Sequence, residues 1–182
     1  EKLQEADKTA IRIKELEDLL LDVEDELNAI ANESESNFHE NNNGGRGYST
    51  SANTVDNAIS YYNELAQIIN DYATNNPGYT IYTPTRRAFM ERLNTAITNA
   101  ENQLNAAYDY HSNHSGDHMY CYKEEEVPDY DSEWSEAIQD FVQVQTGSHI
   151  EHYYESWSKR TFTSLTANTS SELVTNKVEK DE

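Results

Sequence analysis

The chain has 182 residues, with 34 acidic and 13 basic side chains, a net charge of −21 and 36% hydrophobic residues. A surface this acidic repels nucleic-acid phosphates and anionic lipid headgroups, so we expect neither as a partner. The single cysteine excludes an intrachain disulfide, and the sequence has no apolar run of the length that a membrane-spanning helix needs. We therefore expect no direct membrane insertion.

The acidity leaves three uses open: solubility in high salt, binding of several cations, or contact with a basic partner. Lysine is scarce, with seven residues, whereas threonine, asparagine and aspartate are plentiful. This composition favours a salt-adapted protein or one from a virus of a salt-adapted host, with a mesophilic acidic protein as the alternative. The chain begins at Glu1 without a methionine, which is typical of a processed product or a fragment.

The first element expected is a long helix over about residues 2–32. Its apolar residues recur every three or four positions, as on one face of an α-helix, and no glycine or proline interrupts it. The stripe consists of Leu3, Ala6, Ala10, Ile13, Leu16, Leu20, Val23, Leu27 and Ile30. This stripe has to be covered, either by later helices of an antiparallel bundle or by a second chain in a coiled coil.

A polar connector over 32–51 separates this helix from a second one, expected over about 52–74. Ser51 or Thr54 would cap the second helix, and the sequence from Asn75 to Gly78 would end it. A short extended segment follows at 79–82.

The third helix is expected over about 84–108, because Thr83 can cap it and Pro84 suits its first position. Arg86 and Arg87 lie in its first turn, where the helix dipole disfavours cations. They are either solvated charges or a candidate anion-binding site.

Beyond an irregular stretch at 109–131, two shorter helices are expected at 132–145 and 149–159. The expected fold class is mainly α: an antiparallel helical bundle, or coiled-coil-like hairpin, of three long helices plus two short helices. Long polar loops and a flexible C-terminal tail complete it. Three regions follow from this: a long-helix bundle at 1–110, a loop with the short helical pair packed on it at 111–165, and a polar tail at 166–182.

A candidate metal site lies in the irregular stretch, where imidazole and thiol donors of the kind that zinc or nickel prefers are closely spaced. The donors are His111, His114, His118 and Cys121. Their spacing matches no common structural zinc class, so polar loop residues are the alternative. The acidic run Asp129–Glu133 could hold a divalent cation weakly, but it lacks the glycine and the glutamate of an EF-hand loop. We expect no other cofactor.

Three N-x-S/T sequons, at Asn32, Asn113 and Asn168, are glycosylation candidates in expected loops or the tail. Thirteen tyrosines gather around the expected helix ends, and tyrosine is favoured at protein contacts. Packing beneath the loops is the alternative use for them.

The sequence contains no nucleophile elbow, Walker A motif, dinucleotide fingerprint or HExxH motif, so we expect no enzyme. The function expected is that of a structural or assembly subunit of a virion, filament or cell surface, located on an extracellular surface or in a virion. Its partners would be copies of itself or neighbouring structural subunits, in a homo- or hetero-oligomer. The alternative is an extracellular helical domain of a receptor that senses a ligand or a metal.

Overall fold

The computed structural model describes residues 2–40, 45–114, 120–168 and 174–175, and it describes side chains for 7–40, 45–112 and 123–168. The fold is mixed α/β. The helices are α1 (Lys2–Asn32), the short 3₁₀ helix η1 (Glu35–Asn37), α2 (Tyr48–Asn75) and α3 (Pro84–His114). The strands are β1 (Phe38–His39), β2 (Arg46–Gly47), β3 (Tyr79–Thr80), β4 (Tyr120–Ser135), β5 (Asp140–Glu155) and β6 (Val174–Thr175).

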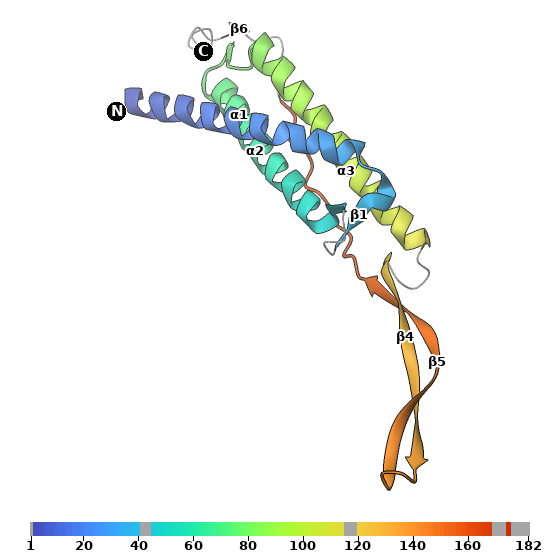
Figure 1. Ribbon diagram of the computed structural model, residues 1–182. Helices are drawn as coiled ribbons and strands as arrows, with labels where there is room; N and C mark the ends of the chain where they lie inside the picture. The colour runs from blue at the N-terminus through green and yellow to red at the C-terminus, as the bar shows by residue number, and fades with distance from the viewer. Residues whose placement is uncertain (1, 41–44, 115–119, 169–173, 176–182) are drawn as a thin grey trace.

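The helical body consists of α1 lying obliquely across α2 and α3 (Figure 1). Each helix contributes one apolar face to a common core, as its three-to-four-residue spacing requires. The largest buried aliphatic side chains are Leu16, Leu20, Leu27 and Ile30 of α1, Leu65 and Ile69 of α2, and Met90, Leu93, Ile97 and Leu104 of α3. The α1 stripe is therefore covered inside the chain from Ile13 onward.

Local signals account for the start of α3. The Thr83 hydroxyl accepts a hydrogen bond from the backbone N–H of Arg86 at 3.1 Å, so Thr83 caps the helix and Pro84 begins it. The α2 helix starts at Tyr48, several residues before Ser51, and Gly47 stands at its N-cap.

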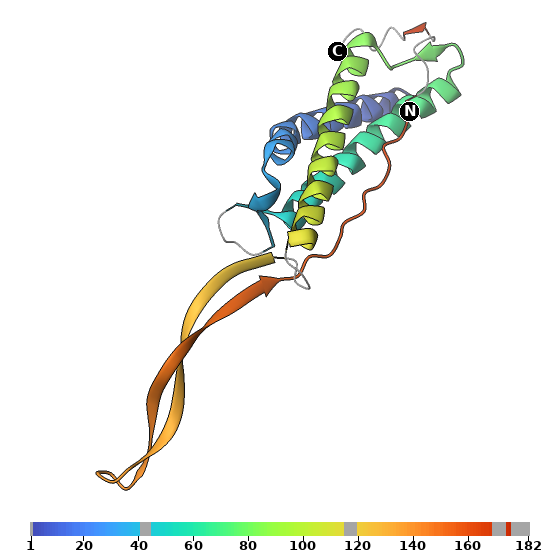
Figure 2. The same ribbon diagram turned by 90° about the vertical axis from the view of Figure 1, so that its right-hand side faces the viewer.

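The second part of the molecule is a β-hairpin that projects from one end of the helical body (Figures 1 and 2). Strands β4 and β5 are 16 residues each and pair antiparallel from Tyr120 opposite Glu155 to Ser135 opposite Asp140. A four-residue loop joins them, and Gln139 takes a left-handed backbone conformation there with φ of 54°. A residue in this conformation is usual where a short hairpin loop rejoins its strand.

This hairpin shows that the mainly α fold class was wrong, because the expected helices at 132–145 and 149–159 are replaced by strand, hairpin loop and, after Glu155, extended chain. Trp134, Ile138 and Phe141 happen to be spaced as on a helix. The alternation of Val142 and Val144 with glutamines is nevertheless typical of a strand, where β-branched side chains are favoured. Ser148, directly before the second of these expected helices, donates across the hairpin to Glu126 at 2.7 Å.

From β5 the chain returns along α2 as an extended segment, which we call the strap (residues 156–168; Figure 2). Asn63 of α2 donates to the carbonyl oxygen of Ser164 at 3.0 Å and accepts from the N–H of Thr166 at 2.8 Å. Asn70 donates to the carbonyl oxygen of Ala167 at 2.9 Å. The start of the expected tail is thus held against α2, and β6 pairs in parallel with β3.

Two adjacent leucines of α1 test the assignment of the core. Leu20 is fully buried, whereas Leu21 is 53% exposed. We expect Leu20→Ala to lower the free energy of unfolding by about 2–5 kcal/mol, because it leaves a cavity, and Leu21→Ala by less than about 1 kcal/mol. Urea titration of both variants measures this; equal losses would contradict the helix packing described above.

Candidate functional site

The projecting hairpin has two unlike sides, because successive strand residues point to opposite faces and paired residues share a face. We call one side the aromatic face. It carries all five of the large apolar residues that are exposed among the described side chains of the two strands: Tyr130, Trp134, Phe141, Ile150 and Tyr154. Trp134 and Phe141 are paired near the tip with ring centroids 5.3 Å apart, and they remain 49% and 64% exposed. Ile138 in the loop is also exposed.

The opposite side, which we call the acidic face, carries six carboxylates. They are Glu125, Asp129, Asp131, Glu133, Asp140 and Glu151. The aromatic face of the described hairpin carries two, Glu124 and Glu126, and both have partners. Glu124 lies 3.1 Å from the His152 ring nitrogen, and Glu126 accepts from Ser148. Most carboxylates therefore lie on one side and the exposed large apolar residues on the other, while the half-buried Val127, Val142 and Val144 share the acidic face.

A small polar network stabilises the acidic face. The His149 ring lies between Glu151 and Asp129, and hydrogen bonds to these two carboxylates raise the pKa of His149. Tyr153 donates to Glu151 at 2.9 Å, which raises the pKa of the Tyr153 phenol to about 12. Lys123 pairs with Glu125 at 3.3 Å and lies 5.3 Å from the centre of the Tyr153 ring.

The hairpin is anchored to the body by buried aromatic and polar groups, which we call the root cluster: Tyr48, Tyr108, His111, Glu155 and Trp157. The Trp157 ring stacks on Tyr48 of α2 at 4.6 Å and lies 4.6 Å from His111 of α3. Tyr108 of α3 lies 6.1 Å from Tyr48. Such ring contacts each contribute about 0.5–1.5 kcal/mol beyond the burial of area.

The polar half of the root cluster centres on the buried carboxylate of Glu155, the last residue of β5. It accepts from the backbone N–H of Glu40 at 2.7 Å and from the indole N–H of Trp157 at 2.9 Å. The Glu40 carboxylate in turn accepts from Ser49 at the start of α2. A buried carboxylate needs such donors, so these contacts fix the point at which β5 leaves the body.

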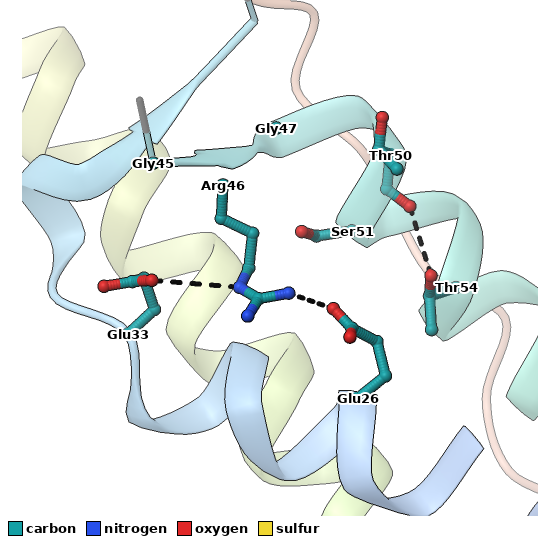
Figure 3. A pocket seen from close by; sticks show the side chains of 8 residues that line it. All are labelled: Glu26, Glu33, Gly45, Arg46, Gly47, Thr50, Ser51 and Thr54. Atoms are coloured by element: carbon teal, nitrogen blue, oxygen red, sulfur yellow. Dashed lines mark hydrogen bonds and ion pairs between the residues drawn. The ribbon is translucent and has the colours of Figure 1, made fainter. Parts of the chain in front are cut away.

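An open hollow of about 410 Å³ lies at the start of α2 (Figure 3). Thr50, Ser51 and Thr54 line it with hydroxyls. Arg46 points into it between Glu26 and Glu33, bonded to the first and 3.8 Å from the second (Figure 3). Arg46 offsets one of the two negative charges and fills the space between the carboxylates, so the hollow is occupied by an ion-paired side chain.

The structure does not bring the predicted metal donors together among the residues it describes. His111 is 1% exposed and belongs to the root cluster. His118 and the side chains of His114 and Cys121 lie outside the described residues. Within those described, His, Cys, Asp and Glu form no group of three that could hold a metal ion. The acidic run Asp129–Glu133 belongs to β4, where alternate carboxylates point to the acidic face.

Arg86 and Arg87 occupy different settings. Arg86 is 3% exposed, with its guanidinium donating to Glu17 of α1 at 3.0 Å and to the carbonyl oxygen of Ile81 at 2.8 Å. Arg87 lies over the Tyr82 ring, 5.3 Å from its centre. Arg86 therefore ties α3 to α1.

The three sequons also differ. Asn32 is exposed at the end of α1, whereas Asn113 lies within the last turn of α3, not in the loop expected there, and its side chain is not described. The Asn168 side chain hydrogen-bonds to the Tyr82 hydroxyl. Of the two described side chains, Asn32 is the accessible one.

No protein-family model matches this chain, and neither does any curated protein or solved structure. Among the described residues, no helix has the length and apolar character that crossing a membrane would need. The geometry of the chain itself therefore carries the functional argument.

Sequence reasoning missed the hairpin and its two faces, although one signal was available. The run from Phe141 to Gln145 alternates between the two sides of a strand, and Tyr130 to Trp134 alternates in the same way. The root cluster gave no such signal, because Tyr48, His111 and Trp157 are far apart in the chain.

The root cluster predicts a pH dependence of stability. Burial lowers the pKa of His111 and His39 lowers it further, whereas Glu155 and the backbone of Glu35 and Phe38 oppose this shift. The His111 imidazole therefore binds a proton more weakly in the folded state than in the unfolded state. As a result, His111 lowers the free energy of unfolding as the pH falls below about 6.5. Between about pH 7.5 and 5.5 we expect the free energy of unfolding to fall further in the native chain than in the His111→Gln variant. The difference between the two should be at most about 1.4 kcal/mol per pH unit. Parallel urea titrations at both pH values measure the difference; an identical pH dependence would contradict a neutral, buried His111.

Proposed function

We propose that this chain is a non-enzymatic structural or assembly subunit that contacts its neighbours through the β4–β5 hairpin. The observation that carries the proposal is the aromatic face: five large apolar residues gather on one side of an arm that stands away from the body (Figure 1). An isolated two-stranded hairpin is marginally stable in water. Contiguous exposed apolar surface also marks interaction sites.

The root cluster supports an arm that works as one piece with the body. It joins the end of β5 to Glu40, which follows β1, and to α2 and α3 through ring stacking and through hydrogen bonds to Glu155. The strap then extends the attachment along α2. A force applied to the hairpin would therefore be transmitted to the helical core.

The charge distribution supports a crowded, salt-rich setting. Subunits of net charge −21 repel each other at low ionic strength. At about 1 M salt the Debye length falls to about 3 Å, and only charges in near contact still interact. Assembly through the aromatic face, which carries two carboxylates against six on the acidic face, then becomes favourable while the acidic face keeps the assembled surface hydrated.

Site-specific photo-crosslinking in the source cells or particles tests the proposal. A full-length chain with p-benzoylphenylalanine in place of Ile138, at the exposed tip of the hairpin, should crosslink to a neighbouring subunit in a high-mass fraction. The matched control replaces Ile11 of α1, which is 58% exposed against 61% for Ile138. Equal crosslinking from both positions, or none from position 138, would contradict the role given to the hairpin.

A further inference from the structure

We infer that the aromatic face binds the aromatic face of a second copy of this chain, so that two hairpins pack face to face with their acidic faces outward. The inference rests on the proposed function and names the neighbour that the hairpin contacts. It follows from the segregation of charge, from the area of the face and from the form of the strand edges.

The segregation of charge makes the aromatic face compatible with itself. Its two carboxylates are already paired with His152 and Ser148 of the same hairpin. Stacking two such faces therefore brings only two hydrogen-bonded carboxylates from each copy together. Stacking two acidic faces would oppose six carboxylates with six more, and Lys123 and His149 lie beside only three of each six. Like charges placed opposite each other at an interface cost several kcal/mol.

The area of the face is sufficient for a specific contact. A strand of 16 residues is about 50 Å long at about 3.3 Å per residue. Two strands with their side chains are about 10 Å wide, so two copies would bury about 1,000 Å², at the lower end of specific interfaces. The aromatic residues near the tip, Trp134 and Phe141, are of the kind that contributes most to such contacts.

The strand edges favour pairing through the face over pairing through the edge. Pro128 removes a backbone donor from β4, and register shifts at Cys121/Lys123 and Asp129/Tyr130 interrupt the ladder. Prolines and bulges are devices that block edge-to-edge addition of strands. A basic partner would instead bind the acidic face, and its binding would weaken as salt increases.

Sedimentation velocity of the purified full chain in about 0.1 M and about 3 M KCl tests the inference. We expect dimers whose dissociation constant falls about tenfold or more as salt screens the repulsion between copies. Trp134→Thr combined with Phe141→Thr should raise the dissociation constant about a hundredfold. The matched control, Val142→Thr combined with Val144→Thr on the acidic face, should leave it within about threefold.

Hydroxyl-radical footprinting of the native chain needs no variant that could unfold the hairpin. Raising the protein concentration should protect Tyr130, Trp134 and Phe141 from oxidation, whereas Tyr153 on the acidic face should react at an unchanged rate. A chain that stays monomeric at all concentrations in both salts would overturn the inference, and so would protection of Tyr153 alone.

The two proposals fail separately. If the purified chain is monomeric but position 138 crosslinks to a different protein in the source particles, the face-to-face dimer is wrong and the assembly function stands. If dimers form in solution and the source material holds nothing larger than a dimer, the assembly function is wrong and the dimer stands.

Discussion

The contact on which the rest of the structure depends is the seating of Trp157 between Tyr48 and His111. It fixes the strap to the start of α2 and to the end of α3, which are far apart in the sequence. The carboxylate of Glu155, held by the Trp157 indole and by the backbone of Glu40, fixes the last residue of β5 at the same place. Without these contacts the nearest attachments of the β5 end to the body described above would be those of the strap to Asn63 and Asn70 of α2, several residues further along the chain.

An arm held in this way can carry exposed aromatic residues without folding back onto the body. The body has completed its own core: α1 covers α2 and α3 from Ile13 onward, and Arg86 is paired with Glu17 beneath the surface. Among the described side chains, six of the nine large apolar residues that remain exposed lie on the hairpin. Under the proposed function, the helices provide a stable base and the hairpin provides the contact.

The sequence was most informative where the signals are local. Thr83 and Pro84 mark the start of α3, and the apolar stripe of α1 marks the face that the other helices cover. The prediction from sequence was wrong at the hairpin, because the spacing of Trp134, Ile138 and Phe141 fits a helix as well as it fits two paired strands and the loop between them. The loop between the strands also lacks the Asn-Gly or Asp-Gly pair that would have indicated a tight turn.

The candidate site depends on contacts that no local pattern encodes. His111 was expected as a metal ligand from its spacing to other donors, and its place beside Trp157 follows only from the packing of three separate segments. The two faces of the hairpin likewise require the register of β4 against β5, including the bulges that keep Tyr130 and Ile150 on one side. The composition shows that the chain carries many charged and aromatic residues. It does not show that the two kinds lie mainly on opposite sides of a hairpin.

Acrylamide quenching of the two tryptophans, in dilute protein and low salt, tests most directly whether the arm is anchored at its root and bare at its tip. Trp134 is 49% exposed and Trp157 is 6% exposed. The emission that remains in Trp134→Phe reports Trp157, and the difference from the native chain reports Trp134. We expect blue-shifted, weakly quenched emission from Trp157 and red-shifted emission from Trp134 that is quenched several times more strongly. Equal quenching of the two would contradict this expectation.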